Sequence, residues 1–296
     1  MPSILRLENR VPQFSRGGSL SAHGILESKR SRSMKIGAVL LFACILITSA
    51  CGGGGSSKSS GASGLLSGNW QIVLTQTQPP PTGSQVQTES GFLTQSGNLL
   101  AGSILQSGAT TCVGLGTASG SVTGSNVSLT LDQTGQTVTL NGTTTSDGAT
   151  VAGDYSILAS GCGSSTVGTF TGTQVKPLSG NLQATFTSGE FSGSVYAFTG
   201  TLTQAPNTGM SYGPLSGSMT STNSPCLNSL SIAGQVRGTS VIFNFLASDG
   251  TAQGQFQGTT STDGTTLTGT YDFLAETNGC YGDAGTVTIA LQPSAK

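Results

Sequence analysis

Residues 142–155 read GTTTSDGATVAGDY, and residues 258–271 read GTTSTDGTTLTGTY. In each stretch an Asp-Gly pair, at Asp147 and Asp263, separates two runs rich in Thr and small residues. An Asp-Gly pair between alternating runs is a strong hairpin signal, because glycine tolerates the positive φ of a tight turn. The two stretches therefore predict the same β-hairpin twice in one chain.

The repeat extends well beyond this hairpin. LSGNW at 66–70 recurs as LSGNL at 178–182, and GSVTGSNV at 120–127 recurs as GQVRGTSV at 234–241. The order of the motifs is the same in both copies, which indicates one ancestral unit that was duplicated. We expect two β-domains, over 66–175 and 178–293, each of ordinary domain size.

Within a unit, apolar and polar residues alternate with the period of a strand that buries one face. Val127, Leu129 and Leu131 share one face, as do Val287, Ile289 and Leu291. Turn signals divide the first unit into about eight strands, near 69–76, 89–96, 98–106, 116–124, 126–132, 136–144, 149–158 and 167–175. We therefore expect an all-β chain of two tandem antiparallel up-and-down barrels, since closure removes exposed edges; two β-sandwiches are the alternative.

The segment from Met34 to Cys51 has the features of an export signal. Lys35 precedes a 15-residue apolar run over 36–50, which is too short to cross a bilayer and ends in small residues before Cys51. Because Met-Lys before an apolar run is a complete signal start, we expect translation to begin at Met34. Residues 1–50 are then leader and signal peptide, and the Gly/Ser-rich residues 51–65 form a flexible tether.

This segment resembles a bacterial lipoprotein signal with its lipobox. The resemblance implies cleavage before Cys51, a diacylglyceryl thioether on Cys51 and acylation of the new amino terminus. Several acyl chains would hold the protein on a membrane essentially permanently. Localisation would then be the cell envelope, and Gly52 after the cysteine favours the outer membrane over the inner one.

Four cysteines of the mature part repeat in register, at Cys112 and Cys162 in the first unit and Cys226 and Cys280 in the second. Export would place them where disulfides persist. We expect Cys112 to pair with Cys162 and Cys226 with Cys280. A metal site is a poor alternative, since no two cysteines are close in sequence and no histidine follows Cys51.

Composition argues against several function classes. Chain-wide, 8% of residues are charged, and the part after Cys51 carries four basic and ten acidic side chains. This excess of negative charge is a poor match to nucleic acid.

Because the part after Cys51 contains no histidine, Ser-His-Asp and Cys-His catalysis are excluded there. We assign no catalytic residue, metal or cofactor; the candidates for a carboxylate-dependent hydrolase would be Glu89, Glu190 and Glu276. Asp147, Asp249 and Asp263 each precede a glycine and are interpreted as turn residues rather than calcium ligands.

Gly68-Asn69-Trp70 resembles the Gly-x-Trp start of lipocalins, and Leu267–Tyr271 resembles a strand of avidin-like barrels. The lipocalin resemblance implies a barrel with a ligand cavity, whose lining would include Trp70, Tyr155, Tyr271 and Phe273. Our leading hypothesis is a non-enzymatic envelope lipoprotein that displays two β-domains for binding or surface structure. The alternative is a carrier of a small apolar ligand.

Overall fold

The computed structural model of the chain describes residues 65–78, 86–107, 114–161, 163–191, 193–221, 223–224, 227–274 and 282–292. All regular secondary structure in these ranges is β-strand. Within the same ranges, no helix has the length and apolar character needed to cross a membrane.

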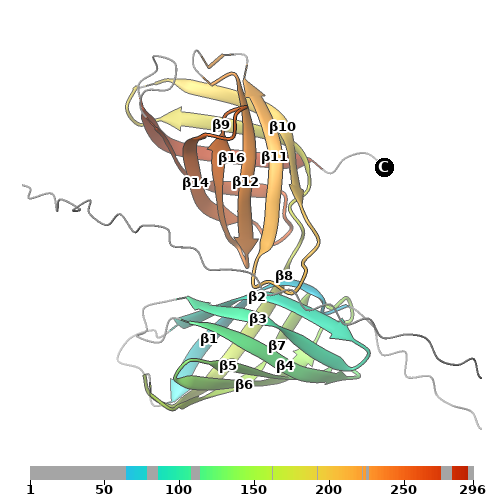
Figure 1. Cartoon of the computed structure of the whole chain (residues 1–296). Coiled ribbons are helices and arrows are strands. Elements are labelled where there is room, and N and C mark those ends of the chain that lie inside the picture. Colours follow the sequence, from blue (N-terminus) through green and yellow to red (C-terminus); the bar gives the residue numbers. More distant parts are fainter. Residues whose placement is uncertain are drawn as a thin grey trace, which may run out of the picture. The chain divides into compact units, whose positions relative to one another are not determined.

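The first eight strands form one closed antiparallel barrel, called barrel one, in which each strand pairs with the next and β8 pairs with β1. The blue-to-green strands of Figure 1 trace this cylinder. Its strands are β1 (Gly68–Gln78), β2 (Val86–Ser96), β3 (Leu99–Ser107), β4 (Leu115–Thr123), β5 (Asn126–Gln133), β6 (Gln136–Thr144), β7 (Thr150–Ala159) and β8 (Thr166–Val175). These bounds lie within three residues of those expected from the sequence.

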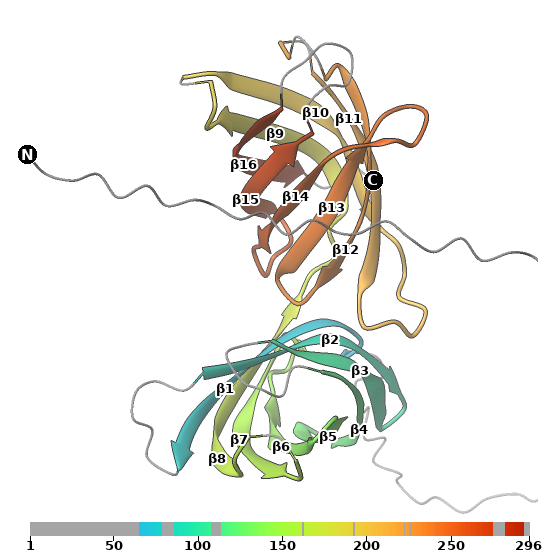
Figure 2. The same cartoon turned by 60° about the vertical axis from the view of Figure 1, so that its left-hand side comes forward.

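The last eight strands form a second closed barrel, called barrel two, in which β16 pairs with β9. The yellow-to-red strands of Figure 2 show it from another side. Its strands are β9 (Gly180–Ser188), β10 (Val195–Gln204), β11 (Gly213–Ser221), β12 (Ser229–Arg237), β13 (Ser240–Leu246), β14 (Ala252–Thr260), β15 (Thr266–Phe273) and β16 (Asp283–Gln292). Ladders that close on themselves confirm the two-barrel prediction over the two-sandwich alternative.

The Asp-Gly hairpins form as predicted. Asp147 accepts hydrogen bonds from the Thr145 hydroxyl at 2.6 Å and the Ala149 backbone amide at 3.0 Å, and Gly148 has φ 72°. Asp263 accepts from Thr265 in the same way in the second copy, again before a glycine of positive φ. The aspartates therefore organise turns, as the sequence indicated.

Paired glycines let neighbouring strands approach closely at equivalent places in the two barrels. Gly142 on β6 lies opposite Gly153 on β7, and Gly258 on β14 lies opposite Gly269 on β15. A Cβ atom on Gly153 would collide with the backbone carbonyl oxygen of Asn141. Such glycines allow a sheet to bend sharply enough to close into a small barrel.

Each barrel has its own hydrophobic core, and the two clusters share no residue. Barrel two is filled by aromatic rings, of which Phe186 is the hub: its ring centroid lies 4.9 Å from those of Phe198 and Tyr271. Barrel one is filled mostly by Leu, Ile and Val, with Trp70, Tyr155 and Phe170 as its aromatic members. The duplicated fold therefore accommodates two differently packed interiors.

Candidate functional site

The repeated LSGN motif fixes the alignment of the two barrels at residue resolution. The Gln95 carboxamide accepts a hydrogen bond from the Leu66 backbone amide, and Gln204 accepts one from Leu178, both at 3.0 Å. The backbone amide of each glutamine in turn donates to the serine that follows that leucine. Gln95 and Gln204 thus occupy equivalent positions on β2 and β10, and other residues can be matched by counting along these strands.

A buried polar cluster lies at the end of barrel one where β2 begins and β3 and β5 end. Its acidic member is Glu89, which is fully buried (0% exposed) beside Gln106 on β3. Gln133 and Gln136, from the hairpin between β5 and β6, are also buried. We call Gln87, Glu89, Gln106, Gln133 and Gln136 the Glu89 cluster.

Hydrogen bonds connect this cluster. Glu89 Oε1 accepts from Gln87 Nε2 at 2.7 Å, and Glu89 Oε2 accepts from Gln133 Nε2 at 2.6 Å. Gln136 Nε2 donates both to Gln133 Oε1 at 2.6 Å and to Gln106 Oε1 at 3.0 Å. Both carboxyl oxygens of Glu89 therefore accept hydrogen bonds from neutral amides.

Burial raises the pKa of Glu89 to about 7, although the hydrogen bonds from Gln87 and Gln133 act in the opposite direction. Desolvation disfavours the charged carboxylate, and amide donors compensate only in part. Glu89 can therefore exchange a proton near neutral pH. Because the carboxyl group is fully buried, it can hold or release that proton but cannot contact a substrate in this arrangement.

Barrel two has a different buried polar cluster at the end where β9 finishes and β16 begins. Asp283 Oδ2 accepts a hydrogen bond from the Tyr271 hydroxyl at 2.7 Å, and Asp283 Oδ1 accepts one from the Ser188 hydroxyl at 2.6 Å. The Ser188 oxygen accepts in turn from the Phe191 backbone amide. Burial and the bond to Asp283 raise the pKa of Tyr271 above that of a free phenol.

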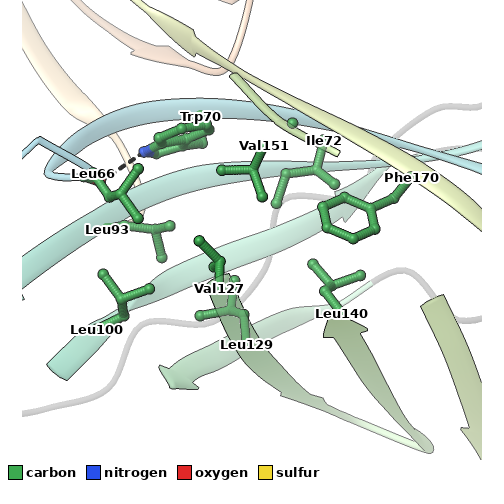
Figure 3. A pocket seen from close by; sticks show the side chains of 11 residues that line it. Leu66, Trp70, Ile72, Leu93, Leu100, Val127, Leu129, Leu140, Val151 and Phe170 are labelled. Carbon is green, nitrogen blue, oxygen red and sulfur yellow. Dashed lines mark hydrogen bonds between the residues drawn. The ribbon is translucent and has the colours of Figure 1, made fainter. Parts of the chain in front are cut away.

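The apolar interior of barrel one contains a small cavity below Trp70 (Figure 3). Trp70 is held in place by its indole Nε1, which donates to the Leu66 carbonyl oxygen at 2.9 Å. The cavity is lined entirely by apolar residues and glycine and measures about 20 Å³. That is room for about one water molecule, whereas small-molecule pockets occupy about 300–1,000 Å³.

A larger hollow of about 450 Å³ lies on the outside of barrel one, over β4, β5 and β6. Hydroxyl and amide groups line it, with Val127 and Gly142 between them: Ser121, Thr123, Asn126, Ser128, Asn141 and Thr143. The Ser128 hydroxyl donates to Asn141 Oδ1 at 2.9 Å, which joins β5 to β6 across the hollow. We call this open, uncharged surface the outer groove.

The structure brings only some of the sequence-predicted residues near one another. Trp70, Tyr155, Tyr271 and Phe273 are all buried inside their own barrels, and of these only Trp70 lines the 20 Å³ cavity. Of the three carboxylates considered for hydrolysis, Glu89 is buried and Glu190 is exposed in the other barrel. Glu276, Cys51 and the four cysteines assigned to disulfides lie outside the described residues.

Sequence reasoning missed the partners of Glu89 and of Tyr271. The signal was present in the alternation: in β5 the inward series Leu129, Leu131 continues to Gln133, and in β6 it starts at Gln136. A polar residue at an inward position near a strand end predicts a buried polar cluster at a barrel mouth. The same signal was present in barrel two, because Asp283 at the first position of β16 is in phase with the inward residues Val287, Ile289 and Leu291.

Among the described residues, no group of three or more His, Cys, Asp or Glu side chains is placed to hold a metal ion. No protein-family model matches this chain, and no curated protein does either.

Proposed function

We propose that this protein is a non-enzymatic lipoprotein of the cell envelope, anchored through Cys51, which uses the outer faces of two packed β-barrels for binding or surface structure. The observation that carries the proposal is the contrast between interior and exterior. The apolar cavity under Trp70 holds about one water, while the outer groove is more than twenty times larger. Contact with a partner would therefore be made from outside.

The chemistry of the outer groove favours a neutral, hydroxyl-rich partner. Its side chains offer hydroxyls that both donate and accept, together with two carboxamides, and none is charged. An uncharged glycan of the envelope has matching groups, whereas a polyanion would require Lys or Arg. The proposed partner class is thus an envelope polysaccharide.

Anchoring is tested by Cys51→Ser in the native host, with membrane and soluble fractions compared by immunoblot. The variant is expected in the soluble periplasmic or extracellular fraction, because the thiol that would accept the diacylglyceryl group is gone. Cys44→Ser, within the apolar run of the signal, is the matched control and should stay with membranes. Membrane retention of Cys51→Ser equal to that of the native protein would refute lipid anchoring.

Glycan binding is tested by cosedimentation of the protein with purified cell-wall polysaccharide from the host. Asn141→Leu with Thr143→Val removes an amide and a hydroxyl from the outer groove and should weaken binding at least tenfold. Thr169→Val, on the outward face of β8, is the control and should bind normally. Equal binding by the groove variant and the control would contradict the assignment of this surface.

The second candidate function is transport of a small apolar ligand inside barrel one. The apolar lining of the cavity under Trp70 favours it. Such a ligand would have to displace side chains, since the existing space is far below the size of a ligand pocket. A saturable, stoichiometric quenching of Trp70 fluorescence by a fatty acid or a sterol would support this function, and no quenching up to millimolar ligand would count against it.

A further inference from the structure

The Glu89 cluster has a feature that none of the functions above uses: an acid buried without a counter-ion. The sequence contains no Lys, Arg or His from residue 59 to residue 175, so no part of barrel one can supply a positive charge. A buried carboxylate normally pairs with a cation or is protonated. In barrel one no cation is available, and only the amide donors of Gln87 and Gln133 support the ionised form.

The other titratable groups of barrel one do not change this conclusion. Strands β1, β3, β4, β6 and β8 carry none. On β5 and β7, Asp132 and Asp154 are exposed, and Tyr155 on β7 is the one inward-facing group besides Glu89. Asp147 is exposed in the turn between β6 and β7. Cys112 and Cys162 lie outside the described residues.

The second barrel shows that the fold does not need an acid at this position. Counting back six residues from Gln95 and from Gln204 gives Glu89 and Phe198, and both lie inside their barrels. Their ladder partners also correspond, since Glu89 lies opposite Gln106 and Phe198 opposite Ser221. Phe198 packs against Phe186 as an ordinary core residue. The acid is thus a specialisation of barrel one.

We propose that Glu89 makes the end of barrel one formed by β2, β3 and the β5–β6 hairpin proton-sensitive: this end is closed while the carboxyl group is protonated and loosens when it ionises. An ionised Glu89 must either stay buried without a counter-ion or move toward water. Moving would break its bonds to Gln87 and Gln133 and disturb the start of β2.

The direction of the pH dependence follows from linkage. The pKa of Glu89 is about 7 in the folded protein against 4.5 for the ordinary group. A raised folded pKa gives stability that is complete below about pH 4.5 and is lost as the pH rises through 7. Between pH 5 and pH 8, the unfolding equilibrium constant of barrel one should rise roughly 70-fold.

The chain provides its own selective probe, because Trp70 is the single tryptophan and lies in barrel one. Urea unfolding of the mature protein is followed by Trp70 fluorescence at pH values from 5 to 8.5. The native protein should show a midpoint that falls as the pH rises. Glu89→Gln should make the urea midpoint independent of pH. Asp132→Asn is the control, because it removes an exposed carboxylate one residue from Gln133, and its midpoint should depend on pH as in the native protein.

Glu89→Met is a second variant, chosen because barrel two has an apolar residue at this position, and it should also lose the slope. A native unfolding constant that changes less than threefold over this range would overturn the proposal. The proposal would also be overturned if the urea midpoint of either Glu89 variant depended on pH as strongly as that of the native protein.

Discussion

At the residue scale, Tyr271 and Tyr155 are a matched pair because they occupy equivalent positions on β15 and β7. Each lies opposite a glycine, Gly285 or Gly168, on the following strand. Tyr271 donates a hydrogen bond to Asp283, whereas the place of Asp283 is taken in barrel one by Thr166. One duplicated position therefore has two different polar surroundings.

Tyr271→Phe should destabilise barrel two by about 1–3 kcal/mol, because it leaves the buried Asp283 carboxylate with fewer donors. Tyr155→Phe removes the equivalent phenolic oxygen from barrel one and should lower the stability of that barrel by less. Urea denaturation followed by far-ultraviolet circular dichroism measures both. Equal losses of stability in the two variants would contradict the role given to the hydrogen bond between Tyr271 and Asp283.

Trp70 provides a second residue-scale prediction, since barrel two has Leu182 in the corresponding motif position. Trp70→Leu should destabilise barrel one by about 3 kcal/mol, because the smaller side chain enlarges the cavity and loses the bond to the Leu66 carbonyl. The measurement is the urea midpoint by circular dichroism. A midpoint unchanged within error would mean that the Trp70 side chain is not part of the core.

At the element scale, the glycine pairs test whether close strand approach is needed for closure. Gly153→Ala should cost about 2 kcal/mol or more, because the added Cβ collides with the Asn141 carbonyl and the backbone must shift. Gly161→Ala is the control, since nothing lies within 4 Å of a Cβ at that position. Thermal denaturation should give a lower midpoint for Gly153→Ala than for Gly161→Ala. Similar midpoints would show that β6 and β7 can move apart without loss of stability.

The strands themselves were predictable because the alternation, the Asp-Gly turns and the duplication all indicated the same hairpins. Strand ends were predicted less well. β2 begins at Val86, three residues before the expected position, because its first residues pair with β1, with Val86 opposite Thr75. Cross-strand pairing extends a strand past the point where hydrophobic alternation stops, and a single strand's sequence does not contain that information.

The polar clusters were the least predictable part of the site. Glu89 was recognised as a carboxylate, but its environment depends on Gln133, which lies more than forty residues away in sequence and is bonded in turn by Gln136. The barrel closes through pairing of β1 with β8, and only that closure determines which inward residues share an end. Long-range contacts of this kind cannot be read from local periodicity.

At the scale of the whole molecule, the two separate cores predict two separable unfolding events. Phe243 stacks on Phe256 in barrel two, with ring centroids 4.6 Å apart. Phe243→Ala should lower the stability of barrel two by about 3–5 kcal/mol. The circular dichroism transition should then split, while the Trp70 fluorescence transition of barrel one stays in place. A shift of both by the same amount would contradict two independent cores.

The central claim is that both barrels are filled by their own side chains, so that any partner binds from outside. Native mass spectrometry of the protein purified from its own host tests this most directly. We predict a mass equal to that of the processed, acylated chain, with no noncovalently bound small molecule. A co-purified apolar molecule in one-to-one stoichiometry, released on unfolding, would contradict the claim and establish an interior carrier instead.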